Sequence, residues 1–177
     1  MKTATTSDGL RIFVSCLASY NNGKLHGTWV NCEGLDAEDL TAEVEAMLAA
    51  SSVPLAEEFA IHDHEGFAAF DIGEFTSLAE IADIVALLDE YGDVARAAAT
   101  LVVNDLEQVR QLCTDKYLGS WRDLEEYAEN LLDGQVNLPP GLACYFDYAA
   151  FGRDLELSGD ISTVEGKGGV LRVFDNH

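Results

Sequence analysis

The alternation of apolar and polar positions near the start of the chain predicts two antiparallel strands. Residues 10–17 are rich in β-branched and aromatic side chains, which favour a strand. Asn22-Gly23 tolerates the positive φ angles of a type I′ turn and therefore predicts a tight hairpin. The returning strand covers residues 25–30, and this turn places Cys16 opposite Trp29.

A helix and a third strand follow the predicted hairpin. Asp36 predicts the N-cap of an amphipathic helix that ends near Ala50 and carries its apolar side chains on one face. Residues 59–66 predict a strand in which Phe59 and Ile61 point inward before a polar turn. These elements together predict a three-stranded antiparallel sheet covered by one helix.

Apolar stripes at helical spacing predict that the middle of the chain is helical. Ser77-Leu78-Ala79-Glu80 forms a capping-box pattern before a helix that ends at Gly92. A second short helix is predicted over residues 93–101, and Asn104 is predicted to cap a third.

The last third of the chain predicts two more helices and a hairpin. Ser120-Trp121-Arg122-Asp123 opens a helix that runs to Asp133, and Asp147 caps a short helix later in the chain. Residues 161–164 and 170–174 predict the two strands of the hairpin.

The predicted elements group into three small domains, which gives the α+β fold class. Residues 1–72 form an N-terminal α+β domain, residues 73–103 a central helical domain, and residues 104–177 a C-terminal α+β domain. The last boundary is placed near the predicted cap at Asn104.

The charge of the chain is strongly negative and unevenly distributed. Thirty-two Asp and Glu residues against ten Lys and Arg give a formal net charge of -22, more than solubility requires. No Lys or Arg occurs from Leu25 to Ala95, whereas seventeen carboxylates lie between Glu33 and Asp93. Such a field repels nucleic acid and attracts basic surfaces. Composition alone leaves two interpretations open: a solvated acidic surface, as in salt-adapted proteins, or a surface that fits a DNA-binding groove.

Few residues suggest catalytic chemistry, and we expect a protein that is not an enzyme. His62 and His64 share one side of an extended segment and could bind a metal, but no third ligand has a matching spacing. The glycines of Gly166-Lys167-Gly168-Gly169 lie between two strands, unlike those of a phosphate-binding loop. No nucleophile elbow or Cys-His arrangement is evident. We therefore expect no cofactor and no metal site.

The cysteines and the hydropathy indicate where the protein works. The four cysteines lack the paired spacing of zinc or redox sites, so we expect reduced thiols in a cytoplasmic protein. No apolar run approaches the length of a membrane span. DNA binding requires Lys and Arg to neutralise phosphates, so the sign of the charge also excludes nucleic acid as a partner.

One stretch near the C-terminus, Leu142 to Leu157, carries a family signature. It holds four aromatic residues within seven positions and one of the ten basic residues, Arg153. The stretch resembles the signature of the ArdA-type antirestriction proteins, which look like double-stranded DNA to type I restriction-modification enzymes. Residues 20–24, 25–27 and 60–63 are similar to the N-terminal part of the same family.

The resemblance implies a fold, a partner and a mechanism. ArdA-type proteins are elongated two-fold dimers of three small domains, which occupy the DNA-binding groove of the type I methyltransferase core and block restriction and often modification. Duplex DNA carries one charge per roughly 1.7 Å, so 22 net charges match about 37 Å of duplex, and a dimer matches about 75 Å. A generic acidic adaptor for a basic partner is the alternative, and displacement of the protein by duplex DNA would distinguish the two.

The expected binding surface consists of carboxylates on the predicted helices and in the segments beside them. These residues are Glu38, Asp39, Glu43, Glu45, Glu57, Glu58, Glu74, Glu80, Asp83, Asp89, Glu90, Asp93, Glu107, Asp115, Asp123, Glu125, Glu126, Glu129 and Asp133.

The aromatic residues of the signature stretch have a different expected role. Tyr145, Phe146, Tyr148 and Phe151 are expected in the core or in a dimer interface, because exposed aromatics would add an aggregation hazard. Arg153 is expected to pair internally with the neighbouring Asp154 or Glu156.

Overall fold

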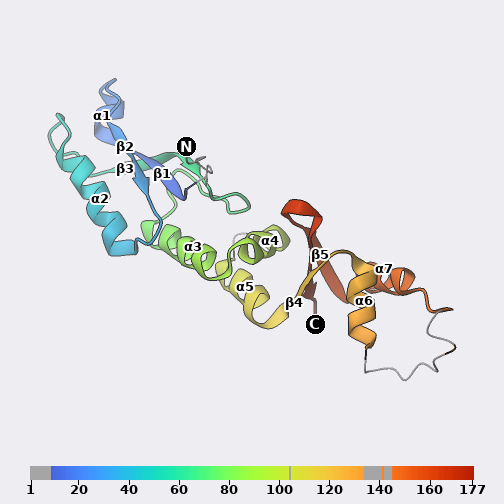
Figure 1. Cartoon of the computed structure of the whole chain (residues 1–177). Helices are drawn as coiled ribbons and strands as arrows, with labels where there is room; N and C mark the ends of the chain where they lie inside the picture. The colour runs from blue at the N-terminus through green and yellow to red at the C-terminus, as the bar shows by residue number, and fades with distance from the viewer. Residues whose placement is uncertain (1–8, 104, 134–140, 142–144) are drawn as a thin grey trace, which may run out of the picture. The chain divides into compact units, whose positions relative to one another are not determined.

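Figure 1 shows the computed structural model of the chain, which describes residues 9–103, 105–133, 141 and 145–177. Helices and small antiparallel sheets are combined in one chain, which confirms the α+β class. The chain divides into two compact units, Met1–Gly92 and Asp93–His177, called here the N-terminal and the C-terminal unit. The three-domain division, the elongated form and the two-fold dimer stay predictions.

The N-terminal unit contains a three-stranded antiparallel sheet in the order β2-β1-β3. Helix α2 contacts β1 and β2 and also contacts α3. The elements of this unit are β1 (Arg11–Cys16), α1 (Leu17–Asn21), β2 (Gly27–Asn31), α2 (Ala37–Ala49), β3 (Phe59–Glu65) and α3 (Leu78–Tyr91).

The core of the N-terminal unit follows from the alternation in β1 and the apolar stripe of α2. Ile12 and Val14 of β1 are fully buried, and so is Leu40 of α2. Arg11 and Phe13, which alternate with them at the start of β1, are not buried, whereas Ser15 near its end is. A strand with alternating faces and a helix with one apolar face can therefore close one small core between them.

The predicted hairpin between the first two strands is wrong in its turn and its register. Phe13, not Cys16, pairs with Trp29, and the amide of Cys16 donates to the carbonyl of His26 at 2.9 Å. A short helix, α1, separates the strands because Cys16 acts as its N-cap, with the thiol accepting from the amide of Ser19 at 3.5 Å. The helix capped by Cys16 therefore takes the place of the two-residue turn predicted at Asn22-Gly23.

The third strand is confirmed, but its buried positions differ from the prediction. Ile61 is buried as expected, whereas Phe59 is only half-buried and Ala60 is fully buried. The pairing of β1 with β3 shifts register between Phe13 and Val14. The shift lies beyond Ile61, and Ala60 pairs in regular register with Ser15, which is also fully buried, so both faces are covered at this end of the sheet.

The C-terminal unit holds a second three-stranded antiparallel sheet, in the order β4-β6-β5. Its elements are α4 (Asp93–Leu101), α5 (Leu106–Gln111), the π-helix η1 (Leu112–Lys116), β4 (Tyr117–Trp121), α6 (Leu124–Leu132), α7 (Tyr148–Ser158), β5 (Ile161–Glu165), the 3-10 helix η3 (Lys167–Gly169) and β6 (Leu171–Asp175). The predicted hairpin of the last two strands is confirmed.

Two local predictions in this unit are wrong. Ser120 and Trp121 belong to strand β4, which pairs with β6, and the helix begins only after its N-cap Asp123. The cap of α5 is Asp105, which accepts from the amide of Gln108 at 2.9 Å, and Asn104 lies outside the described residues. Strand β4 has only half-buried and exposed positions, so its pattern gave no strong apolar signal.

The core of the C-terminal unit lies between its sheet and the helices α6 and α7. Tyr127 of α6, Ile161 of β5 and Val173 of β6 form the buried centre, and partly buried apolar side chains pack around it. Gly152 of α7 allows these two helices to approach closely, because a Cβ atom there would lie 2.5 Å from the carbonyl oxygen of Leu124. None of the described helices combines the length and the apolar character needed to cross a membrane.

Candidate functional site

Helix α2 presents its carboxylates to solvent because its apolar side chains are buried. Asp36 caps the helix and accepts from the amides of Glu38 and Asp39, both at 2.9 Å. Leu40, Val44 and Met47 face the core, so the helix turns its acidic positions outward. The exposed acidic side chains of α2 are Glu38, Asp39, Glu43 and Glu45.

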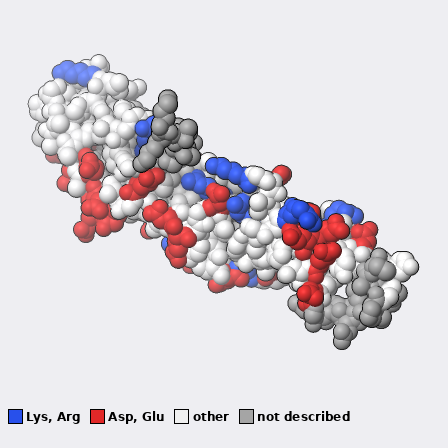
Figure 2. Space-filling model, viewed as in Figure 1, with Lys and Arg blue, Asp and Glu red and all other residues white. Residues whose placement is uncertain are grey.

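Helix α3 repeats this arrangement within the same unit. Ser77 accepts from the amide of Glu80 at 3.1 Å, and Gly92 ends the helix. Five aliphatic side chains of α3 are buried, so its acidic side chains are again on the outside. These are Glu80, Asp83, Asp89 and Glu90. In Figure 2, acidic side chains gather along the surface that α2 and α3 form.

The N-terminal unit carries most of the charge imbalance. Residues 9–92 contain sixteen Asp and Glu residues but only two basic residues, Arg11 and Lys24, a balance of -14. Residues 93–177 contain fifteen acidic and seven basic residues, a balance of -8. The carboxylates of the C-terminal unit therefore have more cations near them.

Seventeen of the nineteen predicted binding carboxylates are exposed, and the half-buried ones are Asp123 and Glu126. Both have structural roles at the start of α6. Asp123 caps the helix and also accepts from Arg122 Nε at 2.8 Å, while Glu126 accepts from the amide of Arg122 at 2.6 Å. The hydrogen bond from Arg122 is the main reason that the pKa of Asp123 is lowered.

Two carboxylates of residues 25–95, the segment that contains no Lys or Arg, form ion pairs with basic residues that are distant in sequence. Arg11 pairs with Glu65 across the sheet at 2.6 Å, and its guanidinium also lies 4.7 Å from the centre of the Trp29 ring. Asp93 of the predicted surface lies 3.4 Å from Arg172. Asp93 also lies 3.9 Å from Nε of Arg96, one turn further along its own helix.

Eight exposed carboxylates of the described residues lie outside the predicted binding surface: Glu33, Asp36, Asp63, Asp71, Asp147, Asp154, Glu156 and Glu165. Among them, Asp63 lies on β3, Asp71 lies after it, and Asp154 lies on α7. Their signal was present in the polar positions of these segments, but the prediction gave most weight to the acidic helices. They add acidic groups outside α2, α3 and α6.

The histidine cluster near the end of β3 is engaged with its own neighbours. The ring of His62 meets Tyr20 edge to face, and that of His64 meets Phe67 in the same way. Asp63 accepts from the amide of His64 at 2.8 Å. Within the described part of the chain, no group of three or more His, Cys, Asp and Glu side chains is placed to hold a metal ion.

The signature stretch forms helix α7 and a cluster of aromatic rings before it. Asp147 is confirmed as the N-cap and accepts from the amide of Ala150 at 2.8 Å. Phe146 contacts Tyr148 and Phe151, with ring centres 4.8 and 5.8 Å away. These three side chains are half-buried, whereas Tyr145 is 82% exposed. Residues 142–144 of the signature lie outside the described residues.

Arg153 does not form the predicted ion pair on α7. It is exposed, and none of the described carboxylates lies within ion-pair distance of it. Glu156, one of the two expected partners, instead accepts from the hydroxyl of Thr163. Arg153 lines an open pocket of about 410 Å³ whose rim also includes Arg122, Glu125 and Glu165. Both signs of charge line this pocket, so its charge selects no class of ligand.

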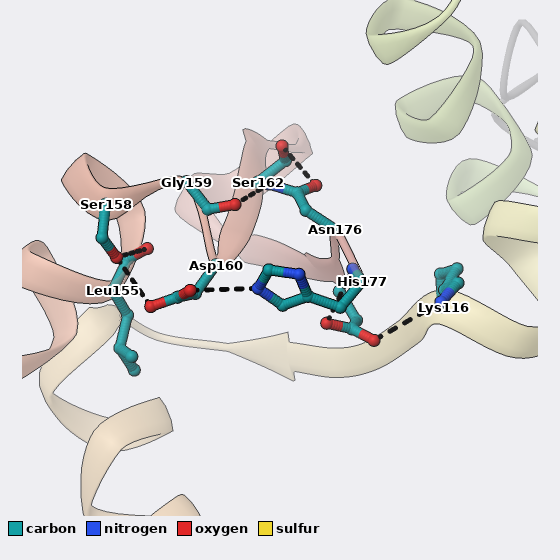
Figure 3. A network of polar contacts seen from close by, with 9 residues as sticks. Lys116, Leu155, Ser158, Gly159, Asp160, Ser162, Asn176 and His177 are labelled. Atoms are coloured by element: carbon teal, nitrogen blue, oxygen red, sulfur yellow. Dashed lines mark hydrogen bonds and ion pairs between the residues drawn. The ribbon is translucent and has the colours of Figure 1, made fainter.

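A polar network joins the end of α7 to the end of β6 (Figure 3). Asp160 accepts from Ser158 Oγ at 2.7 Å through one oxygen and lies 3.0 Å from His177 Nε2 through the other. Asn176 donates to the carbonyl of Gly159 at 2.9 Å. The serine and the imidazole are bound to the same carboxylate, not to each other, so the trio lacks the serine–histidine contact of a hydrolase triad.

We expect the network to stabilise the C-terminal unit near neutral pH and to lose this stabilisation in acid. The hydrogen bond from Ser158, followed by that with His177, lowers the pKa of Asp160. A lowered pKa in the folded state means that stabilisation is present above the pKa of the unfolded chain and is lost as pH falls through the folded value.

Urea unfolding at several pH values between about 5 and 2, around the ordinary Asp pKa of about 3.9, tests this expectation. The pH dependence should decrease in Asp160→Asn and also in Ser158→Ala, because Ser158 supplies the largest contribution. An unchanged slope in both variants would show that the network does not contribute.

Comparison with known proteins adds one finding. The sequence model of the antirestriction protein (ArdA) family matches residues 12–169, which is most of the chain and the greater part of each unit. No curated protein sequence matches the chain.

Proposed function

Since the chain belongs to the antirestriction protein (ArdA) family, we propose that it blocks type I restriction-modification enzymes by occupying their DNA-binding groove as a DNA mimic. Membership of this family gives the chain an antirestriction function, and the family is one of inhibitors rather than a known class of enzymes. The methyltransferase core is the part of the enzyme that the proposal names, and both cleavage and modification of DNA should be blocked there.

The exposed carboxylates of α2 and α3 are the observation that supports this proposal most strongly. Eight acidic side chains project from two adjacent helices of a unit whose charge balance is -14. A groove that binds duplex DNA presents Lys and Arg to a row of phosphates. Carboxylates held on rigid helices can meet the same cations, because ion pairing depends on charge and spacing rather than on the phosphate itself.

A generic acidic adaptor is the competing function, and competition with DNA separates the two. The wild-type protein should bind a purified type I methyltransferase core in a titration, and duplex DNA containing the enzyme's target should displace it. The same DNA should fail to displace an adaptor that binds elsewhere on the enzyme. Binding that DNA leaves unchanged would exclude the mimic and favour the adaptor.

We also expect the protein to be a homodimer that associates partly through the C-terminal unit. The aromatic group at the start of α7 supports this, because Phe146, Tyr148 and Phe151 are only half-buried and Tyr145 is 82% exposed. Aromatic side chains are enriched at interfaces and rarely left exposed as a group.

Light scattering at micromolar concentration should give the mass of a dimer of a 19.2 kDa chain. Replacing Tyr145 with Ser should shift the equilibrium towards the monomer, whereas Tyr20→Ser, an exposed tyrosine of the N-terminal unit, should not. A monomeric mass for the wild-type protein would contradict the prediction.

A further inference from the structure

Arg172 is a buried arginine with an incomplete set of partners. The residue is 9% exposed, and its Nη2 lies 3.4 Å from Oδ2 of Asp93. Its Nε is buried and has no hydrogen-bond acceptor among the described residues. A buried guanidinium is costly unless it is paired, so Asp93 provides most of the compensation visible for this charge.

Gly166 makes room for the buried guanidinium. Its φ of -102° is accessible to any residue, so backbone conformation does not require glycine here. A Cβ atom at this position would instead overlap Nη1 of Arg172. The amide of Gly166 donates to the carbonyl of Val170 at 2.7 Å, which fixes the glycine beside the arginine.

Asp93 is the first residue of α4, a helix that has little apolar side-chain area with which to hold itself in place. All four of its buried residues are alanines, Ala95, Ala97, Ala98 and Ala99. Helix α4 contacts β5, α5 and η1. Each buried alanine contributes only one methyl group of apolar area. Polar contacts are therefore more important for holding α4 in place than they are for α6 or α7.

The chain passes from one unit to the other between Gly92 and Asp93. Gly92 ends α3 with φ 53° and ψ -124°, a conformation that favours glycine. We propose that the Asp93–Arg172 pair is a latch that fastens α4 to the C-terminal sheet and thereby confines the joint between the units to Gly92. When the ion pair is formed, residues 93–101 move as part of the C-terminal unit. When it is broken, α4 detaches from the sheet, and residues 93–101 become part of the flexible connection between the units.

The proposal gives Asp93 a structural role in place of the binding role expected from sequence. It also predicts an asymmetry between the two partners. Asp93→Asn leaves a buried cation without its carboxylate. Arg172→Met removes the buried charge and leaves Asp93, whose side chain is 49% exposed, in contact with water and 3.9 Å from Nε of Arg96. Adding Arg172→Met to Asp93→Asn should therefore restore much of the attachment of α4.

Hydrogen exchange of the full chain, read by mass spectrometry, measures this attachment because amide exchange follows local opening. In Asp93→Asn the amides of α4 should exchange at least about tenfold faster than in the wild type, while those of α6 and α7 should change little. Gly166→Ala, which displaces the guanidinium, should give the same local pattern. Asp89→Asn, an exposed carboxylate of α3, is the matched control and should leave α4 unchanged.

Each outcome decides the proposal. Faster exchange confined to α4, with rescue by Arg172→Met, supports the latch. Unchanged exchange of α4 in Asp93→Asn overturns it. Equal acceleration throughout the C-terminal unit also overturns it, because the pair would then stabilise the whole unit rather than one helix. Acceleration in α4 without rescue would indicate loss of the favourable acid at the helix N-terminus, and would overturn the latch as well.

Discussion

A variant in which ten exposed carboxylates are replaced by their amides is expected to lose several kcal/mol of binding free energy to the methyltransferase core. Each exposed ion pair is worth about 0.2–1 kcal/mol, and the losses should accumulate across a distributed surface. A loss of about 4 kcal/mol corresponds to roughly a thousandfold weaker dissociation constant. The ten positions are Glu38, Asp39, Glu43, Glu45, Glu80, Asp83, Asp89, Glu125, Glu129 and Asp133.

The matched control replaces the same number of exposed uncharged polar residues, including Gln111 and Asn130, and should leave binding nearly unchanged. A single change such as Glu80→Gln or Glu129→Gln should weaken binding only a few-fold. If one such change abolished binding while circular dichroism showed an intact fold, binding would depend on one specific contact rather than on a distributed acidic surface.

Salt provides an independent measurement of the same mechanism. Binding should weaken between about 50 and 200 mM salt, but less steeply than DNA binding, since a folded protein releases no counterion layer as dense as that of DNA. The protein should therefore compete best against DNA at moderate salt. An affinity that stays constant over this range would contradict a mechanism based on charge.

Gly152→Ala should destabilise the C-terminal unit by about 1–3 kcal/mol, as expected for an added methyl group in a tightly packed site. A Cβ atom at this position would lie 2.5 Å from the carbonyl oxygen of Leu124 and 2.9 Å from its Cβ. Backbone atoms cannot rotate away, so α6 and α7 must separate. The sign of the stability change is informative, because a Gly→Ala substitution inside an exposed helix ordinarily stabilises the helix by up to about 1 kcal/mol.

The two tryptophans allow this effect to be assigned to one unit. Trp29 lies in the N-terminal unit, and Trp121 packs against Tyr127 in the C-terminal unit, with ring centres 5.8 Å apart. In a Trp29→Phe background, urea unfolding followed by fluorescence should show a lower midpoint for Gly152→Ala. The control Gly73→Ala, where the nearest atom to a Cβ is 3.8 Å away, should leave the midpoint unchanged. Equal midpoints for all three proteins would show that the close helix contact can relax.

The helices that carry the acidic surface could be predicted from the sequence because their signals are local. Asp36, Ser77, Asp123 and Asp147 each cap a helix by accepting from an amide two or three residues later. The apolar stripe of each helix then determines which side chains face solvent. The sequence alone therefore predicted the α+β class, the existence of these four helices and the exposure of most of their carboxylates, although it began α6 at Ser120 rather than after Asp123.

The strand pairing, by contrast, was decided by contacts between residues that are distant in sequence. The register of β1 against β2 depends on the helix α1 between them, and β4 exists because β6 pairs with it. A one-residue change in such a register exchanges the faces of a strand, so small errors in a turn propagate along it.

The same distinction applies to the charges. Composition determined that the chain is strongly acidic, but it gave no information on which carboxylates are already neutralised. Arg11 reaches Glu65 across 54 positions and Arg172 reaches Asp93 across 79. A helix cap depends only on residues in the next turn of the chain. An ion pair between different helices or strands forms only when the whole fold brings its two partners together. The sequence thus determined how much negative charge the protein displays, and the tertiary structure decided which part of it remains available to a partner.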